Sequence, residues 1–182
     1  QTVIPPGIDS TAFTISPTER DIDLLAVGSL IPLKQYDIFI QLVNQLTKTF
    51  PEASAVLIGS GPEKEKLEYL IEKYGLQSTI RLTGELPHQT VFEYMQRTKI
   101  FIHPSAYEGF GMVCAEALYA GATVISFVKP MKEEVPGWIN VATPEEMTAA
   151  ASHLLQQKET YTSSLHFSMA NSVKSIMALL GF

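Results

Sequence analysis

The chain has one cysteine, Cys114, among its 182 residues. A single cysteine excludes an intramolecular disulfide, and no Cys/His cluster with the spacing of a zinc site occurs. We therefore expect no metal site and a reducing, cytoplasmic setting, in which Cys114 is a packed core thiol.

Long hydrophobic runs are also missing, because no apolar stretch approaches the roughly 20 residues that a membrane-spanning helix needs. The first residues lack the basic and apolar blocks of a signal peptide. Positive charge is scarce, with 13 Lys and Arg against 19 Asp and Glu and a formal net charge of -6. A nucleic-acid backbone requires a basic face, so this balance argues against nucleic acid as a partner. An anionic ligand must then be bound by a local pocket.

What the chain does have is enough apolar material for one core, with 46% hydrophobic and 18% charged residues. Strand-like and helix-like segments alternate along it. This pattern predicts an α/β fold, a Rossmann-like, doubly wound parallel sheet of about six strands with helices on both faces. The predicted strands are 23–27, 55–58, 80–82, 100–103, 123–127 and 139–142. The predicted helices are 36–50, 62–74, 91–97, one beginning near 111, 143–156 and 167–180.

The most informative segment, 105–118, places two carboxylates and two glycines at a predicted strand-to-helix turn. Unpaired N–H groups and the helix dipole attract an anion to a helix N-terminus, and Gly109 and Gly111 would let a phosphate approach the backbone. Glu108 would lie at the carboxyl end of the strand, where ligands of open α/β sheets bind, and could accept hydrogen bonds from sugar hydroxyls. Glu116, about one turn into the helix, leans back toward the same ligand and suits a ribose diol.

An isolated glutamate is more often a solvated surface residue than a ligand-binding one. Around Glu116, however, the predicted helix is apolar on nearly all sides, which indicates that it is mostly buried. These neighbours are Cys114, Ala115, Ala117, Leu118 and Ala120. A carboxylate in such a helix requires a polar partner, so we favour the ligand-binding interpretation.

The segment resembles the signature of the retaining glycosyltransferases of the GT-B fold, family 4 (glycosyltransferase group 1), in which a Glu, seven residues and a second Glu follow one another. Glu108 and Glu116 form this E-x7-E motif, and the residues beside them match the family's flanking residues. Three more segments look like family landmarks: 3–9 with Phe13, 27–30 with Lys34, and 57–62. The resemblance covers roughly residues 1–127 well and the remainder loosely.

The resemblance implies the donor-binding domain of an enzyme that transfers a hexose from a nucleoside diphosphate sugar to a hydroxyl acceptor with retention. It implies no metal or other cofactor, and polysaccharide biosynthesis is the family-level expectation. A missing N-terminal domain would bind the acceptor, and any association with a membrane surface would come through the full-length enzyme. The implied divisions are an interdomain linker (1–20), the nucleotide-sugar-binding domain (21–157) and a helical tail that would cross to the N-terminal domain (158–182).

Carried over residue by residue, the resemblance makes Glu108 the catalytic residue, which orients the sugar, and gives Glu116 the ribose. Lys34 would clamp the diphosphate, but Ser29 stands where the family has an Arg, which removes a two-point phosphate contact. Gln35 stands where the family commonly has a Gly. The remaining residues expected at the donor, with Leu86 at the nucleobase, are Gly28, Gly59, Leu86, Gly109, Phe110, Gly111, Met112 and Val113.

Two alternatives stay open. A sugar-nucleotide epimerase-like enzyme could use a related architecture, because a fold alone does not decide the reaction. A non-catalytic module could use the same pocket to bind a nucleotide sugar or a partner, and Ser29 favours this alternative. A dehydrogenase is disfavoured, because Lys64 stands where its dinucleotide-binding fingerprint needs a third glycine.

Two further expectations concern residues outside the motif. His103 ends a predicted strand before Pro104, and we interpret it as a structural histidine rather than a catalyst. The last predicted helix places apolar residues on one face, which we expect to pack elsewhere or to self-associate. These residues are Met169, Val173, Ile176, Met177 and Leu180.

Overall fold

The computed structural model describes residues 6–10, 13, 19–129, 131, 134–157 and 163–180. Six strands form one sheet in the order β3-β2-β1-β4-β5-β6, and every neighbouring pair is parallel. The strands are β1 (Ile22–Val27), β2 (Ala55–Ile58), β3 (Ile80–Gly84), β4 (Thr98–His103), β5 (Thr123–Ser126) and β6 (Trp138–Asn140). The predicted doubly wound α/β fold is confirmed, and its strand order reverses between β1 and β4.

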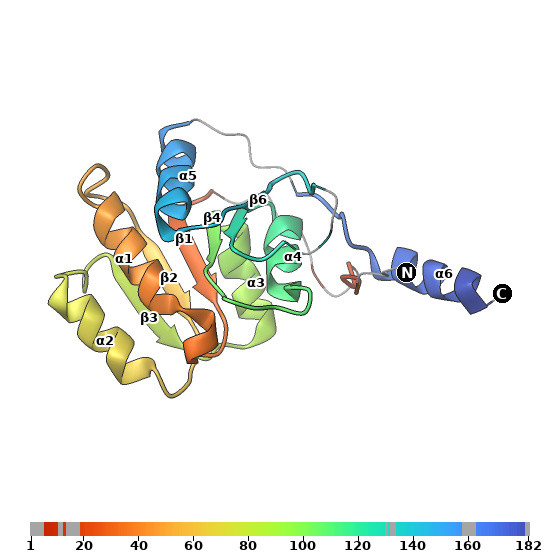
Figure 1. Cartoon of the computed structure of the whole chain (residues 1–182), viewed down its shortest axis with the longest axis horizontal. Coiled ribbons are helices and arrows are strands. Elements are labelled where there is room, and N and C mark those ends of the chain that lie inside the picture. Colours follow the sequence, from red (N-terminus) through yellow and green to blue (C-terminus); the bar gives the residue numbers. More distant parts are fainter. Residues whose placement is uncertain are drawn as a thin grey trace.

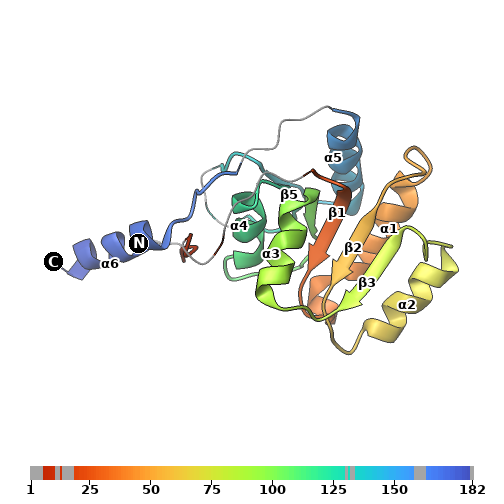
Figure 2. The same cartoon turned by 180° about the vertical axis from the view of Figure 1, so that it is seen from behind.

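Helices cover both faces of this sheet. They are α1 (Tyr36–Leu46), α2 (Lys64–Lys73), α3 (His88–Gln96), α4 (Met112–Tyr119), α5 (Pro144–Gln156) and α6 (Met169–Leu180), and a 3-10 turn, η1 (Pro32–Lys34), precedes α1. Figure 1 shows α1, α2 and α5 in front of the sheet, and Figure 2 shows α3 and α4 on the opposite face. Because all six strands are parallel, the loops that follow their carboxyl ends lie together at one edge of the sheet.

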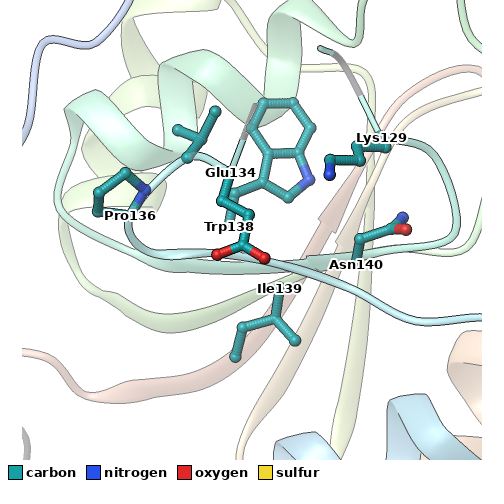
Figure 3. Close-up of a pocket in the computed structure, with 7 residues that line it drawn as sticks. Lys129, Glu134, Pro136, Trp138, Ile139 and Asn140 are labelled. Atoms are coloured by element: carbon teal, nitrogen blue, oxygen red, sulfur yellow. The ribbon is translucent and has the colours of Figure 1, made fainter. Parts of the chain in front are cut away.

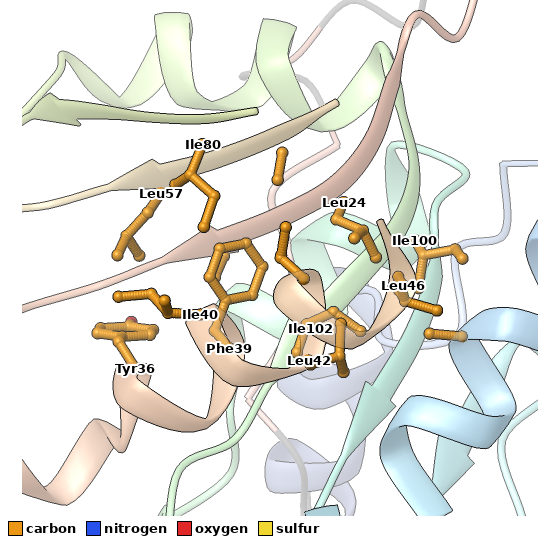
Figure 4. Packing of buried hydrophobic residues seen from close by; sticks show 14 of the residues in the cluster. Leu24, Tyr36, Phe39, Ile40, Leu42, Leu46, Leu57, Ile80, Ile100 and Ile102 are labelled. Atoms are coloured by element: carbon orange, nitrogen blue, oxygen red, sulfur yellow. The ribbon is translucent and has the colours of Figure 1, made fainter. Parts of the chain in front are cut away.

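Each face of the sheet has its own hydrophobic core. On one face, apolar residues of α1 such as Phe39 and Ile40 pack on Leu24, Leu57 and Ile100 of the strands (Figure 4). On the other face, residues of α3 and α4 pack on the outward side chains of the same strands. Strands buried on both faces consist of near-continuous apolar residues, as β2, with the sequence Ala-Val-Leu-Ile, does.

Two helix boundaries that differ from the predicted ones lie next to prolines. The first helix ends at Leu46, four residues before the predicted end, because the chain turns ahead of Pro51. Helix α3 begins at His88, three residues before the predicted start, directly after Pro87. The polar first turn of α3 carries no apolar periodicity, so the sequence pattern did not include it.

The first described segment and the segment that leads into α6 meet beside the second core. Ile8 and Ser168 form a parallel bridge, and Ile8 and Phe167 are buried against α3 and α4 residues. Beyond the bridge, α6 projects away from the sheet (Figures 1 and 2), and its Met169, Val173 and Ile176 are exposed. Within the described residues, no helix has both the length and the apolar character needed to cross a membrane.

Candidate functional site

The candidate site lies at the carboxyl ends of β1 and β4, the neighbouring strands between which the sheet order reverses. In open α/β sheets this reversal opens a crevice, because the two loops leave toward opposite faces. Gly28 and Ser29 follow β1, and the loop that carries Glu108 follows β4. The topology therefore brings together residues that lie about 80 positions apart in the sequence.

Glu108 is the centre of a cluster of charged and polar groups. Lys34, the last residue of η1, forms an ion pair with its Oε1, and the side chains of both residues are 17% exposed. His103 lies 2.9 Å from the same oxygen through Nε2. Burial alone would raise the pKa of Glu108, but the Lys34 hydrogen bond and the nearby His103 outweigh it and hold the pKa below its usual range. The carboxylate is therefore ionised at neutral pH.

His103 lies next to Glu108, a contact that the sequence did not predict. Its side chain is buried, and its Nε2 contacts the carboxylate of Glu108, to which the resemblance assigns the catalytic role. Burial lowers the pKa of the imidazole, and Lys34 adds to this effect while Glu108 opposes it. The ring is therefore neutral at pH 7. The available sequence signal was its position at the end of the strand that precedes Glu108.

Two glycine-bearing loops pack against each other beside this cluster. Gly59 has a φ of 152°, and a Cβ placed on it would lie 1.9 Å from the carbonyl oxygen of Gly28. A Cβ on Gly28 would in turn lie 2.6 Å from the hydroxyl of Tyr36 and 3.8 Å from Cε of Lys34. Only glycine fits at Gly59, because any side chain there would meet the backbone of the neighbouring loop.

A pocket opens in front of these loops and contains four predicted donor-binding residues, Gly28, Ser29, Gly59 and Leu86. Its other lining residues are Val27, Ile58, Ser60, Glu85 and Val91. Apolar walls with a few polar groups at the rim are typical of sites for a small organic ligand. Ser29 is exposed at this pocket and offers a neutral hydroxyl.

Gln35 provides an unusual backbone turn between Lys34 and α1. Its φ of 50° places it in the left-handed region, where it is the only non-glycine residue among the described positions. This conformation costs a non-glycine residue about 1 kcal/mol. The preference of the family for Gly at this position has a backbone explanation, and Gln35 accepts the strain while keeping Lys34 on Glu108.

The N-terminus of α4 faces the same crevice. Gly111 is its N-cap, with φ 80° and ψ 53°, and no side chain caps the helix. The N–H groups of Met112 and Val113 therefore begin the helix at its positive end. A Cβ on Gly109 would meet no atom within 4 Å, which shows open space in front of this loop. Phe110 instead packs edge-on against Phe167, with centroids 5.0 Å apart.

Glu116 lies in the next turn of α4 and is held by a residue that the sequence did not single out. Its Oε1 is 3.1 Å from Nε2 of His88, at the start of α3. Around Glu116 the helix is buried, as predicted, and the Glu116 side chain itself remains 17% exposed. The carboxylate can therefore accept a hydrogen bond from a ligand at the helix N-terminus.

The described part of the chain contains no group of three or more His, Cys, Asp or Glu side chains that could hold a metal ion. The side chains of Lys34, Glu108 and Glu116 and the α4 dipole contribute charge to the site. Cys114 is fully buried, and burial raises the pKa of its thiol, so it is an inert core residue as predicted.

A second cavity lies at the β6 edge of the sheet. Figure 3 shows Lys129, Glu134 and Asn140 around the indole of Trp138. Trp138 connects this region to the site, because its ring packs beside Gly111 while its Nε1–H donates to Ser126 Oγ at 2.8 Å. The indole thus packs against the glycine that caps the N-terminus of α4.

A family model described as "Glycosyl transferases group 1" matches residues 9–161 of the chain. The gpi3 subunit of the Schizosaccharomyces pombe phosphatidylinositol N-acetylglucosaminyltransferase is 33% identical over 149 residues, which are 79% of this chain and 33% of that protein. A Homo sapiens subunit of an enzyme with the same name is 32% identical over 126 residues, which are 68% of this chain and 26% of that protein. The chain thus spans a third or less of the length of these relatives.

Solved structures share the fold. The pneumococcal O-GlcNAc transferase GtfA, crystallised with UDP and GlcNAc, superposes with a TM-score of 0.69 at 20% identity. The match covers 94% of this chain and 34% of that one. At this identity the likeness establishes a common Rossmann-like architecture, the type found in GT-B glycosyltransferases.

Proposed function

The chain belongs to the glycosyl transferases group 1 family, and from this premise we propose that it is the donor-binding domain of a retaining glycosyltransferase. In this proposal it binds a nucleoside diphosphate sugar, from which a hexose is transferred to a hydroxyl acceptor. The observation that carries the proposal is the convergence of Lys34 and Glu108 at the strand-order reversal, beside the N-terminus of α4. These groups supply the two kinds of contact that a sugar diphosphate needs, positive charge for phosphate and carboxylate for hydroxyls.

The geometry supports a definite arrangement of the donor. The nucleobase occupies the pocket beside Leu86, and the ribose diol donates to Glu116. The diphosphate lies between Lys34 and the first N–H groups of α4, and the open space at Gly109 admits it close to the backbone. The hexose then reaches Glu108, whose ionised oxygens accept hydrogen bonds from its hydroxyls.

In the reaction, these groups act mainly by electrostatics. As the glycosidic bond breaks, negative charge develops on the departing nucleoside diphosphate. The Lys34 ammonium has three N–H donors, so it can contact a phosphate oxygen while it keeps its ion pair with Glu108. The N–H groups at the start of α4 stabilise the same charge. Ser29 contributes a hydroxyl where an Arg would have supplied a further positive charge.

The first donor to test is UDP-N-acetylglucosamine. Two relatives are named as parts of a phosphatidylinositol N-acetylglucosaminyltransferase, and the pneumococcal neighbour was crystallised with UDP and GlcNAc. These names support the choice of base and sugar for this chain. They also support partners, because both relatives are named as subunits, and we propose that the acceptor site and any contact with a membrane surface belong to other parts of a cytoplasmic enzyme.

Calorimetric titration of the chain with UDP, GDP, ADP, UMP and UDP-N-acetylglucosamine tests the proposal. We expect the uridine diphosphates to bind and UMP to bind more weakly, since it lacks the second phosphate. Lys34→Ala and Glu116→Gln should each weaken binding of UDP about tenfold, which is the loss of one charge-assisted contact.

Matched controls are available in Lys48→Ala, past the far end of α1, and Glu72→Gln at the end of α2, both exposed. Neither should change the affinity. Equal affinity of UDP for wild type, Lys34→Ala and Glu116→Gln would reject the proposed donor site. Binding of UDP-N-acetylglucosamine without transfer by the complete enzyme would instead identify a non-catalytic module.

A further inference from the structure

We propose that His103 is a positioning residue. The N–H at Nε2 of its neutral imidazole donates a hydrogen bond to Glu108 and fixes the carboxylate in the orientation that receives the donor sugar. The inference rests on the proposed function, because it assumes that Glu108 faces the sugar. It assigns to a buried strand residue a role in sugar recognition.

The first step is the geometry of Glu108. His103 Nε2 lies 2.9 Å from Oε1, and the Lys34 ammonium contacts the same oxygen from the other strand-to-helix loop. Both contacts therefore fall on one carboxylate oxygen. The two contacts fix the rotation of the Glu108 side chain. Neither donor is directed at Oε2, so this oxygen can accept a hydrogen bond from a ligand hydroxyl.

The second step is the tautomer of His103. The ring is 1% exposed, and its Nδ1 has no hydrogen-bond partner in the described part of the structure. A proton on Nδ1 would leave a buried N–H donor unsatisfied, at a cost of about 1–3 kcal/mol. The network thus assigns the proton to Nε2, where the N–H donates a hydrogen bond to Glu108.

The third step concerns the charged groups around the ring. Glu108 and Lys34 face His103 from the two loops, and Phe101 of the same strand stacks on it with centroids 6.3 Å apart. The positive Lys34 and the buried position both favour the neutral ring. A neutral donor adds orientation to Glu108 without cancelling its charge, and Lys34 remains the cation that serves the phosphates.

A purely structural histidine would hold the loop rather than the carboxylate. The start of this loop is already fixed elsewhere, since the N–H of Ala106 donates to the carbonyl of Leu33 at 3.0 Å and Ser105 Oγ donates to the carbonyl of Tyr107 at 2.9 Å. His103 instead contacts the side chain of Glu108, which follows these two hydrogen bonds in the sequence. Removal of the imidazole is therefore expected to release the Glu108 side chain before the loop.

The test separates the sugar from the nucleotide. Titration with UDP and with UDP-N-acetylglucosamine gives two dissociation constants. The ratio of the UDP constant to the UDP-N-acetylglucosamine constant measures how much affinity the sugar adds. In His103→Leu we expect this ratio to fall about fivefold, which corresponds to one lost orienting hydrogen bond, while the UDP affinity changes less than twofold. In His103→Gln the ratio should recover, because the Gln amide nitrogen reaches the position of Nε2.

His103→Asn covers the case in which His103→Leu does not fold. Its amide reaches only the position of Nδ1, so it keeps a polar group but cannot donate to Glu108, and it should lower the ratio as His103→Leu does. In a Glu108→Ala background, the same substitutions should leave the ratio unchanged. The exposed His153→Gln on α5 is the matched control.

The possible failures are distinct. Absence of binding of UDP, GDP and ADP by the wild type would reject the proposed function. Binding of UDP with no contribution from the sugar in the wild type would overturn the role of Glu108, and with it that of His103, while preserving the nucleotide site. Equal losses for UDP and UDP-N-acetylglucosamine in the His103 variants, or no loss, would show a structural histidine and overturn only this inference.

Discussion

His88 and Glu116 join two helices across the candidate site, with Nε2 of His88 3.1 Å from Oε1 of Glu116. His88 opens α3, and Phe13 packs edge-on against its ring with centroids 5.0 Å apart. The imidazole is thus held by an aromatic neighbour while it contacts the carboxylate proposed to bind ribose. The contact with His88 occupies Oε1 of Glu116 and orients Oε2.

We predict that His88→Ala weakens UDP binding about twofold to fivefold, because Glu116 loses one orienting hydrogen bond of roughly 0.5–1 kcal/mol. Glu116→Gln should have the larger effect, since it removes the charge itself. Calorimetry of both variants, with His153→Ala as control, checks the order of the effects. An affinity that rises in His88→Ala would show that His88 competes with the ligand for Glu116.

Two glycines of the site separate stability from binding. Gly59→Ala places a methyl group 1.9 Å from a backbone oxygen, so we expect it to lower the free energy of unfolding by about 2–3 kcal/mol. Gly109→Ala meets no protein atom within 4 Å and should change stability by less than about 0.5 kcal/mol. The same methyl group would obstruct a phosphate at the loop and weaken UDP binding about tenfold.

Urea unfolding of these two alanine variants gives their free energies of unfolding, and calorimetry gives their affinities for UDP. A Gly109→Ala variant that is stable and binds UDP as the wild type does would place the diphosphate elsewhere.

Acid should destabilise the fold through His103 before it acts on Glu108. Burial lowers the pKa of His103 in the folded chain, while the unfolded ring titrates near its ordinary value of about 6.5. As the pH falls through about 6.5, the unfolded state therefore takes up a proton that the folded state does not, and stability declines. Glu108, whose pKa is also lowered by its partners, acts in the same direction below about pH 4.5.

His103→Gln removes the first of these effects. We expect its free energy of unfolding in urea to change less than that of the wild type between pH 7 and pH 5. His153→Gln, at an exposed position, should retain the wild-type dependence. Parallel slopes for wild type and His103→Gln would contradict the neutral, buried imidazole.

Trp138 is the only tryptophan in the chain and can report occupation of the site. Its indole packs beside Gly111, at the N-terminus of α4, so a phosphate bound there changes the field around the ring. We predict a saturable change in its fluorescence on addition of UDP, with the dissociation constant found by calorimetry. Lys34→Ala should shift the curve to higher concentration. Calorimetric binding without any fluorescence change would place the phosphates away from α4.

Much of the fold was predictable from sequence because the relevant signals are local. Alternating strand and helix periods predicted the α/β fold, and Gly111 marked the start of α4. The spacing of Glu108 and Glu116 placed one in a loop and the other a turn into the helix, as the structure has them. Such features depend on neighbours within a few residues.

The partners of these carboxylates were not predictable in the same way. Lys34 lies 74 residues from Glu108, and His88 lies 28 residues from Glu116, so each pair depends on how strands order in the sheet. His103 is only five residues from Glu108, but the loop between them has no periodicity that predicts which side chains meet. The residue type of Gln35 does not indicate its left-handed turn, and the available signal was the Gly that the family commonly has at this position.

The bridge between Ile8 and Ser168 has a mechanical consequence. The N–H of Ile8 donates to the carbonyl of Phe167 at 2.7 Å, and the N–H of Met169 donates to that of Ile8 at 3.0 Å. The segments run parallel, so a pull on the chain before Ile8 and after Ser168 acts along both in opposite directions. Such a load shears the two hydrogen bonds together instead of unzipping them in turn. Tension applied between these two segments therefore acts on the Ile8–Ser168 bridge before it reaches the sheet that holds the site.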